Sequence, residues 1–380
     1  MILYQLNKFN VKYKPEIPFT VEMMIEINYD LWQYLANDNK PIVVYGMGDG
    51  ADKLISALKR IEREPDDYFA SDGFVRGQFF HGKQVLSFAD ICKKYDKFIV
   101  LVSFGTQIPE VIENICRIDS EFELYAPDLP VCPGELFTYD FYSLHKDEFE
   151  LARSLLCDDI SKKEFDDVLN YKLSGKIKYI KFSQSSQISI AKSELKCYNY
   201  KSYVDGGAYN GDTVLQMCSL CPSLSKVYAF EPDARSFRKM DKTLADVSIP
   251  VIKHNAALGN YDGDCVIYEK GNRNTSLYGD KATDAVKKMI SVCKLDTVLG
   301  GESVDFIKLD VEGAELDALS GAENTIKTYQ PDMQISLYHR PDDMFTIIPK
   351  VYGMYTSPRI SVRKTRYIPA WDFNMYLVND

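Results

Sequence analysis

Residues 204–213 read Val-Asp-Gly-Gly-Ala-Tyr-Asn-Gly-Asp-Thr, and this stretch decides the fold of the C-terminal half of the chain. It lies between a predicted strand, which contains Tyr203, and a predicted helix. Its paired glycines let the backbone approach a ligand, and the N-terminus of the following helix helps to hold polar groups of that ligand. The stretch therefore predicts a ligand-binding turn at a sheet edge; a tight turn with no ligand is the alternative.

Two further strand ends supply groups suited to a nucleoside. Glu231 ends the predicted strand at residues 227–230, where an acidic side chain can accept both hydroxyls of a ribose. The segment His-Asn-Ala-Ala-Leu-Gly at residues 254–259 follows the next strand and places the Asn255 amide where an adenine ring would lie. Three successive strand ends thus predict a nucleoside site.

The fourth and fifth strand ends carry groups that can move a proton. Asp310 follows the fourth strand, at the edge where open α/β sheets bind their ligands. His339 follows the fifth, and an imidazole is the side chain best suited to taking a proton near neutral pH. Alternatively, His339 caps a strand or bonds to a backbone carbonyl, and Glu312 and Glu315 only favour the dipole of a helix. For Glu315 we expect this structural role.

Strand and helix signals alternate regularly from residue 202 onward, which is typical of a parallel sheet covered by helices. The predicted strands are 203–204, 227–230, 251–252, 305–309 and 333–338. Two later apolar runs, at residues 360–362 and 374–378, have no clear helix between them. We therefore expect them to form an antiparallel hairpin that closes one edge of the sheet.

The N-terminal half contains a second strand, glycine turn and helix pattern. After an apolar run that begins at residue 41, Gly46, Gly48 and Ala51 have the spacing of the dinucleotide-binding turn G-x-G-x-x-A. A second predicted strand ends at residues 68–72, where Asp72 is placed to contact a ribose, and a third strand is predicted at 98–103. These residues predict a small parallel domain with a second nucleotide or sugar-nucleotide site. A degenerate scaffold or a dimerisation domain is the alternative.

The other segments have weaker patterns. We predict helices over residues 20–36 and 145–173, and a strand or hairpin arm over 176–182, where apolar and polar residues alternate. The expected domains are an N-terminal helical extension at 1–40, a small Rossmann-like domain at 41–120, a connector of uncertain structure at 121–199, and a C-terminal domain at 200–380.

Composition narrows the class of partner. A chain of 380 residues exceeds what one core usually organises, so about two domains are expected. A net charge of −10 argues against nucleic acid or anionic lipid as a partner, and no run of about 18 apolar residues offers a membrane span. The N-terminus lacks a signal-peptide pattern. The nine cysteines are scattered and odd in number, which suits free thiols and therefore favours the reducing cytoplasm. Small molecules remain the expected partners.

Residues 200–380 resemble the FkbM family of S-adenosylmethionine-dependent methyltransferases. The resemblance rests on VDGGAYNGDT, FEPD, HNAALG, FIKLDVEGAEL and SLYHRPDDM, which occur in the family's order. It implies a class I methyltransferase fold: a seven-stranded, doubly wound α/β sheet with an antiparallel C-terminal hairpin, here preceded by the smaller Rossmann-like α/β domain. It also implies S-adenosylmethionine as cofactor and an oxygen acceptor on a sugar, a glycan precursor or a similar small metabolite.

The resemblance also implies roles for individual residues. Asp205, Gly207 and Gly211 would form the methionine-side loop, Glu231 would contact the ribose, and Asn255 with Ala256 would form the adenine wall. The full set of expected cofactor-binding residues is Asp205, Gly206, Gly207, Asn210, Gly211, Thr213, Glu231, Pro232, Asn255 and Ala256.

Methyl transfer from a sulfonium is an in-line displacement in which the enzyme aligns donor and acceptor and excludes water. A hydroxyl acceptor also benefits from a base. We expect His339 to be that base, Asp310 to orient the acceptor or the imidazole, and Glu312 to be a second polar partner. A divalent metal on Asp310 and Glu312 is an alternative that we do not favour.

Two other functions remain open at this point. A nucleotide-sugar oxidoreductase or epimerase would use the N-terminal glycine turn with a nicotinamide cofactor. A non-catalytic scaffold would keep the cofactor pocket only for sensing a ligand. The acceptor and the oligomeric state, including a homodimer, are left open by the sequence.

Overall fold

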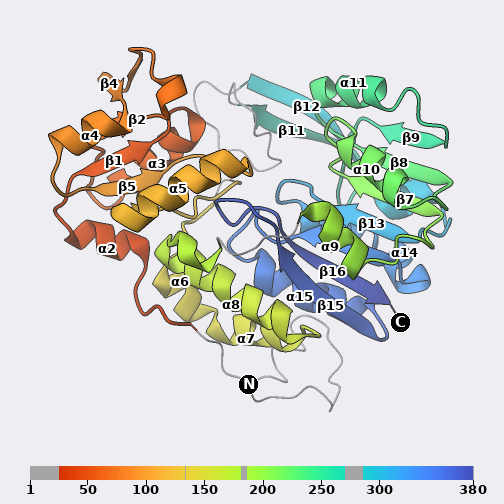
Figure 1. Ribbon diagram of the computed structural model, residues 1–380. Helices are drawn as coiled ribbons and strands as arrows, with labels where there is room; N and C mark the ends of the chain where they lie inside the picture. The colour runs from red at the N-terminus through yellow and green to blue at the C-terminus, as the bar shows by residue number, and fades with distance from the viewer. Residues whose placement is uncertain (1–24, 133, 181–185, 270–285, 380) are drawn as a thin grey trace.

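The computed structural model describes residues 25–132, 134–180, 186–269 and 286–379. Two large sheets form two lobes, and in the view of Figure 1 a helical segment lies below the N-terminal lobe and beside the C-terminal one. The expected α/β class, with two parallel-sheet cores, is confirmed.

The N-terminal lobe is built on a six-stranded sheet in the order β3-β4-β2-β1-β5-β6. β1 lies between β2 and β5 and runs parallel to both. The chain therefore moves outward in opposite directions from β1, which creates a topological switch point at the carboxyl ends of β1 and β5. The strands are β1 (Ile42–Tyr45), β2 (Asp67–Phe69), β3 (Phe79–Phe80), β4 (Lys83–Leu86), β5 (Ile99–Val102) and β6 (Glu123–Tyr125).

The predicted strands at 41–45, 68–72 and 98–103 correspond to β1, β2 and β5, whereas β3, β4 and β6 went unpredicted. These unpredicted strands have two to four residues, and unlike the continuous apolar runs of β1 and β5 they show neither an apolar run of four nor a period-two alternation. The helices and 3-10 turn of this lobe are α2 (Leu31–Asn37), α3 (Asp49–Lys59), η1 (Asp72–Phe74), α4 (Phe88–Lys94) and α5 (Pro109–Glu121).

The C-terminal lobe contains a seven-stranded sheet in the order β15-β16-β14-β13-β7-β8-β9. Only β16 runs antiparallel to its neighbours, β14 and β15. The expected seven-stranded sheet with an antiparallel C-terminal hairpin is therefore confirmed. The strands are β7 (Ser202–Gly206), β8 (Lys226–Phe230), β9 (Val251–His254), β13 (Phe306–Leu309), β14 (Asp332–Ser336), β15 (Pro358–Lys364) and β16 (Phe373–Asn379).

A separate three-stranded sheet, in the order β10-β12-β11, was not predicted. It consists of β10 (Ala256–Leu258), β11 (Gly263–Glu269) and β12 (Val286–Cys293), and lies near the top of the C-terminal lobe in Figure 1. The helices of this lobe are α10 (Asp212–Leu220), α11 (Ala234–Thr243), α12 (Leu295–Leu299), α13 (Glu315–Gly321), α14 (Glu323–Tyr329) and α15 (Asp343–Met354).

The segment between the lobes is helical and packs on the C-terminal sheet. It contains α6 (Tyr139–Leu144), α7 (Lys146–Ser154), α8 (Asp159–Ser174), the 3-10 turn η2 (Ile177–Tyr179) and α9 (Gln187–Glu194). α7 packs on α15, and α8 packs on β15. One hydrophobic cluster contains residues of both lobes, such as Val43 and Ile335, and of this segment, such as Phe165. The lobes therefore share a core.

Three local predictions are corrected. The helix expected at 145–173 is divided into α7 and α8, because the Cys157 amide donates to the Ile360 carbonyl and Asp158 caps α8. The expected strand at 176–182 forms η2 over its described residues, with Ile177 and Ile180 both buried at a spacing of three. The helix expected at 20–36 begins only at Leu31, where Asp30 forms a capping box; its residues before 25 lie outside the described residues.

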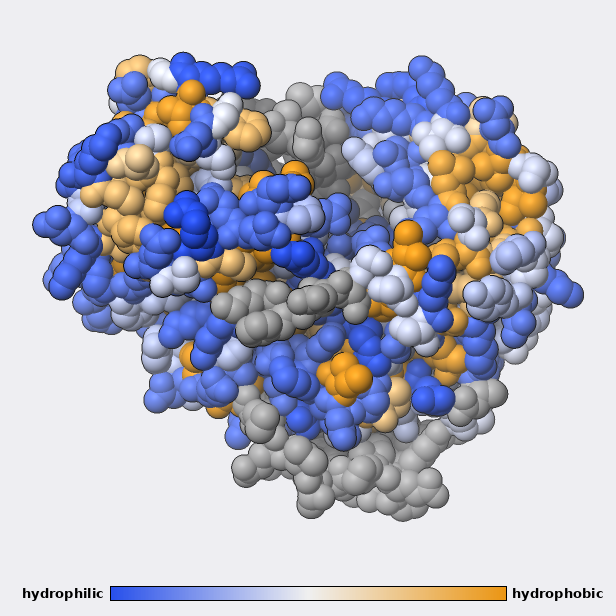
Figure 2. All heavy atoms as spheres, viewed as in Figure 1, coloured by the Kyte–Doolittle hydropathy of each residue, from blue (hydrophilic) through white to orange (hydrophobic). Residues whose placement is uncertain are grey.

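The face shown in Figure 2 is mainly hydrophilic, and its hydrophobic residues gather in separate groups. In the part of the chain that the structure describes, no helix combines the length and the apolar character that crossing a membrane requires.

Candidate active site

The turn after β7 is pressed against the turn after β13. Gly207 has φ +80°, and a Cβ added there would lie 1.9 Å from the Asp310 carbonyl oxygen. The Asp310 amide donates to the Gly206 carbonyl at 3.0 Å. A side chain at residue 207 would both strain the backbone and separate these two turns. The glycine pair therefore brings the expected cofactor loop into contact with the residue expected at the reaction centre.

Asp205 is completely buried and acts inside the protein. Its carboxylate accepts a hydrogen bond from the Thr213 hydroxyl and another from Lys308 Nζ, at 3.1 Å. Lys308 lies on β13 and also approaches Asp310, at 3.9 Å. Burial acts to lower the pKa of Lys308, but the charges of Asp205 and Asp310 raise it overall. Asp205 and Thr213 thus fix the shape of the expected cofactor loop by joining β7 to β13 and α10.

The same loop ends in a second tight approach. Gly211 has φ +86° and precedes α10, and a Cβ there would lie 2.9 Å from Leu244. Asn210 Oδ1 accepts from the Asp212 amide at 3.2 Å. These contacts position the N-terminus of α10 beside the loop.

Glu231 ties the loop after β7 to the end of β8. Its carboxylate accepts from the amides of Tyr209, at 2.9 Å, and of Asp233, at 2.7 Å. Burial raises the pKa of Glu231 to about 7, although these two amides oppose the shift. A carboxylate oxygen has two acceptor sites, so both oxygens can still accept from a ligand hydroxyl.

Asn255 adds the turn after β9 to the same edge. Its amide nitrogen donates to the carbonyls of Glu231, at 2.8 Å, and Pro232, at 3.2 Å. Ala256 follows as the first, buried residue of β10. The three predicted strand ends therefore meet at one sheet edge, joined by hydrogen bonds through Glu231.

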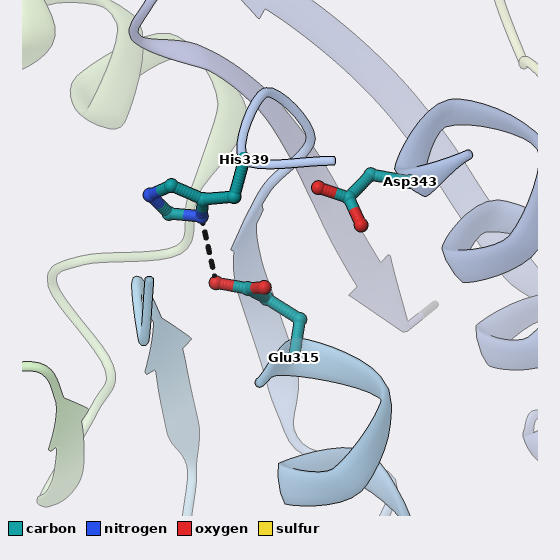
Figure 3. A group of neighbouring side chains, drawn as sticks. All are labelled: Glu315, His339 and Asp343. Atoms are coloured by element: carbon teal, nitrogen blue, oxygen red, sulfur yellow. Dashed lines mark hydrogen bonds and ion pairs between the residues drawn. The ribbon is translucent and has the colours of Figure 1, made fainter. Parts of the chain in front are cut away.

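His339 lies at the centre of a group of carboxylates. Its Nε2 lies 3.5 Å from an Asp310 oxygen and 3.7 Å from a Glu312 oxygen, and its Nδ1 lies 2.9 Å from Glu315 Oε1. Figure 3 shows His339 and Glu315 turned toward each other, with Asp343 on the other side of Glu315. The structure thus brings together the three residues expected to be catalytic.

The charge on His339 differs from what a general base requires. Burial acts to lower its pKa, but the charge and hydrogen bond of Glu315, with the charges of Asp310 and Glu312, raise it to about 10. At neutral pH the ring therefore carries a proton on both nitrogens and has no lone pair with which to accept another. The expectation that His339 is the base does not fit this environment.

The two remaining carboxylates differ from each other. Burial acts to raise the pKa of Asp310, but Lys308, His339, and hydrogen bonds from Ser336 and Tyr338 lower it overall. The Glu312 side chain is 53% exposed by area, yet the protein atoms around it desolvate the carboxylate enough to raise its pKa. Glu312 is therefore the stronger base of the pair.

Glu315 and Asp343 are buried partners that the sequence reasoning did not assign to the site. Glu315 Oε1 accepts from the Val311 amide at 2.9 Å and contacts His339, so beyond facing the helix dipole its carboxylate holds the imidazole in place. Burial and the charge of Glu315 raise the pKa of Asp343 to about 8. Glu315 Oε2 is also buried, and within the described part of the chain it has no hydrogen-bond partner. A proton on Asp343 would supply the missing donor.

The ligand atoms of Glu315, His339 and Asp343 lie within 4.8 Å of one another. This is a different set from Asp310 and Glu312, where a metal was considered in the sequence. A cation bound here would have to displace the proton that Glu315, Asp310 and Glu312 favour on the imidazole. In the sequence, this buried set was visible only as Glu315 and Asp343 at the starts of two helices. Acids at helix starts commonly serve only to favour the helix dipole.

The residues of the N-terminal glycine turn are not gathered around one ligand position. Gly46 packs against Ser103 and Phe104, and Ala51 is buried in the core. Gly48 has open space where a Cβ would lie. Asp72 is exposed in η1, after β2. The expected second nucleotide site stays a prediction that only Gly48 supports directly.

Comparison with known proteins identifies the C-terminal lobe. Residues 205–356 match the family model described as Methyltransferase FkbM domain. "Methyltransferase 1" of Beauveria bassiana is 26% identical over an alignment that covers 34% of this chain and 64% of that protein, so the chain spans less than two thirds of that relative. The crystal structure of Methyltransferase FkbM from Methylobacillus flagellatus KT superposes with a TM-score of 0.69 at 18% identity, covering 99% of this chain and 98% of the other. The shared fold therefore includes the N-terminal lobe.

Proposed function

We propose that the FkbM methyltransferase domain of this chain transfers a methyl group from S-adenosylmethionine to a hydroxyl of a sugar-type acceptor. The observation that carries the proposal is the contact between two sets of residues. The turns around Glu231 form one set and the Asp310, Glu312 and His339 cluster forms the other, and Gly207 joins them at the Asp310 carbonyl.

The residues at the sheet edge fit an S-adenosyl group. Glu231 offers a carboxylate for ribose hydroxyls, and Asn255 offers its amide oxygen beside the apolar wall of Ala256 for adenine, while its amide nitrogen is held by main-chain carbonyls. We place the amino acid end of the cofactor at the loop from Gly207 to Gly211, whose shape is fixed by hydrogen bonds to Phe230 and Glu231. The bound cofactor would supply an electrophilic methyl group on a sulfonium.

The proton of the acceptor hydroxyl is best taken by Glu312. Its pKa is raised and its side chain is the most exposed of the carboxylates around His339. Asp310 is held by Ser336, at 2.9 Å, and by Tyr338, at 3.1 Å, so it is suited to orient the acceptor. Protonated His339 places a fixed positive charge between these two carboxylates. It thereby favours the ionised form of Glu312, which is the form that accepts a proton.

Mass spectrometry of the purified protein for a copurified nucleoside, followed by an acceptor screen, tests this function. The screen would measure release of S-adenosylhomocysteine from S-adenosylmethionine in the presence of saccharides. The expected result is S-adenosylmethionine binding and saccharide-dependent release. Failure to bind S-adenosylmethionine would overturn the proposed cofactor, whereas binding with release only on amine acceptors would overturn the proposed oxygen acceptor.

A further inference from the structure

A cavity of about 420 Å³ lies at the carboxyl ends of β1 and β5, at the switch point of the N-terminal sheet. Its walls come from both lobes. Gly48, Asp49 and Phe104 belong to the N-terminal lobe, whereas Pro369 and Trp371 belong to the loop between β15 and β16 of the C-terminal lobe. The volume lies within the range of small-molecule sites, and such sites are frequent between domains.

The wall shared by the two lobes is held by main-chain hydrogen bonds. The Thr106 amide donates to the Ile368 carbonyl at 2.8 Å, and the Ile368 amide donates back to Thr106 at 3.0 Å. The Trp371 ring packs on Gly105, where an added Cβ would lie 2.5 Å from a ring carbon. The indole therefore has a defined position in the cavity wall.

Two segments that line the cavity lead along the chain to residues that interact with the candidate active site. On one side, Leu129 and Pro130 line the cavity, and Cys132 shortly afterwards donates from Sγ to the Glu312 carbonyl at 2.9 Å. On the other side, Trp371 is followed by Asp372, whose charge acts on Tyr338, the residue that bonds to Asp310. In both cases the chain leads from the cavity lining to a residue that interacts with the site, and the charge of Lys53, which lines the cavity, acts to lower the pKa of Glu312.

The lining favours an uncharged ligand with an apolar face. Asp49 and Lys53 both line the cavity, 3.9 Å apart, so their charges oppose each other. Lys53 Nζ also approaches the carbonyls of Pro130 and Val131, at 3.4 and 3.2 Å. A phosphate beside Gly48 would face the Asp49 carboxylate, whereas hydroxyls can donate to that carboxylate and accept from Lys53.

The glycine turn itself does not require a nucleotide. A Cβ on Gly50 would lie 1.9 Å from the Ser103 carbonyl oxygen, and one on Gly46 would lie 2.6 Å from the Ser103 hydroxyl. These two glycines therefore let the segment after β5 pack on the turn. Asp72, the residue expected to contact a ribose, is not among the described residues that line the cavity.

We propose that this interdomain cavity binds an uncharged saccharide ring of the methyl acceptor, stacked on Trp371, and that the N-terminal lobe is the acceptor-recognition domain. The proposal rests on the proposed methyltransferase function and names the place where its acceptor is held. Aromatic rings and a few convergent polar groups are the usual means of fixing such a ligand.

The chain contains two tryptophans, Trp32 and Trp371, which makes the test specific. In protein labelled with ¹⁵N at the indoles, two indole resonances are expected, and Trp371→Phe assigns them. Methyl glycosides of hexoses and deoxyhexoses at millimolar concentration should shift the Trp371 resonance and leave that of Trp32, which is buried in α2, in place. If no glycoside shifts the Trp371 resonance, the proposal is overturned.

AMP, UDP and NAD form the second arm. Saturable shifts of the Trp371 resonance by these nucleotides, with none from glycosides, would overturn the saccharide proposal in favour of a nucleotide site. Calorimetric titration of S-adenosylmethionine is run in parallel. If the protein binds glycosides but does not bind S-adenosylmethionine, the result would count against the methyltransferase function and leave the cavity assignment standing.

Variants complete the design. Trp371→Ala should weaken glycoside binding by roughly tenfold or more, measured by saturation-transfer difference NMR, and leave S-adenosylmethionine affinity unchanged. Lys53→Met, which retains the indole, should weaken glycoside binding as well and provides a second test if Trp371→Ala does not fold. Phe79→Ala, at a side chain that is 69% exposed, is the matched aromatic control and should have no effect. Unchanged glycoside binding in both cavity variants would contradict the proposal.

Discussion

His339 and Glu315 form a buried pair in which Nδ1 of the imidazole lies 2.9 Å from Oε1 of the carboxylate and each side chain is 1% exposed. The two residues come from different elements, since Glu315 begins α13 and His339 follows β14. Removing one partner of such a pair leaves an uncompensated charge in the protein interior. The pair therefore governs both the stability of the site and the charge that it presents to a substrate.

Glu315→Ala should lower the free energy of unfolding by about 3–5 kcal/mol, as expected when one partner of a buried ion pair is removed. Urea unfolding followed by circular dichroism measures the change. Glu302→Ala, which removes a largely exposed glutamate, should change stability far less, because an exposed ion pair is screened by solvent. Equal effects of the two substitutions would show that the pair is not formed.

Asp343→Asn should be at least as stable as the wild type between pH 6 and pH 8, because the wild-type carboxyl is ionised in the unfolded chain and must take up a proton on folding. The carboxyl of Asp343 accepts from the Arg340 amide at 2.7 Å, and its raised pKa of about 8 means that it is protonated at neutral pH. An asparagine amide reproduces that acceptor and, like the protonated carboxyl, is neutral and can donate a hydrogen bond. Asp343→Ala, by contrast, should cost about 1–3 kcal/mol in unfolding free energy. If Asn and Ala destabilise equally, Asp343 is ionised in the folded protein.

The stability of the wild-type protein should decrease as pH rises from 7 to 10. Folding raises the pKa of His339 from 6.5 to about 10, so its contribution is fully present below pH 6.5 and is lost as pH rises through 10. Each pKa unit corresponds to about 1.4 kcal/mol. The urea concentration at the unfolding midpoint, measured at pH 6, 8 and 10, should fall with pH, and it should fall less steeply in His339→Gln than in the wild type. An identical slope in both proteins would exclude His339 as its source.

Glu231→Gln should weaken S-adenosylmethionine binding by roughly tenfold or more, because hydrogen bonds to an ionised group contribute about 1.5–3 kcal/mol. Since the pKa of Glu231 is about 7, wild-type affinity should also fall between pH 8 and pH 6, whereas the variant should bind equally at both. Calorimetric titration measures both effects. Glu302→Gln is the control, because Glu302 contacts Lys226 at the opposite end of β8 from Glu231. If the affinity of Glu231→Gln depends on pH in the same way as that of the wild type, the assignment is refuted.

Glu312→Gln should reduce turnover by about 100-fold, the typical contribution of a positioned base, and leave S-adenosylmethionine affinity unchanged. The acid side of the wild-type pH–rate profile should report the raised pKa of Glu312. A rate that rises only toward pH 10 would instead identify neutral His339 as the base. Asp310→Asn should raise the acceptor KM as well as lower kcat, because Asp310 is expected to orient the acceptor.

Removal of metal should leave turnover unchanged. A cation bound by Glu315, His339 and Asp343 would have to displace the imidazole proton, and the proposed transfer step uses no metal. Dialysis against EDTA followed by the S-adenosylhomocysteine assay tests this expectation. Restoration of a lost rate by Mg²⁺ would return Asp310 and Glu312 to consideration as metal ligands.

The sequence by itself determined which candidate site residue follows each predicted strand of the C-terminal sheet. Gly207, Glu231, Asn255, Asp310 and His339 each follow a predicted strand, and parallel strands bring their carboxyl ends to one edge. Short local patterns therefore sufficed to place these five residues together. The antiparallel hairpin was also predictable, since two apolar runs at 360–362 and 374–378 had no helix between them.

Only the tertiary structure decided what those residues can do. The pKa of His339 depends on carboxylates from the turn after β13 and the start of α13, and its proton therefore follows from packing rather than from its own pattern. Likewise, Asp205 looked like a ligand contact but is buried against Lys308, a partner more than 100 residues away. The cavity between Gly48 and Trp371 exists only because two lobes meet. Electrostatic environment and interdomain shape depend on distant segments in three dimensions, and no local spacing encodes them.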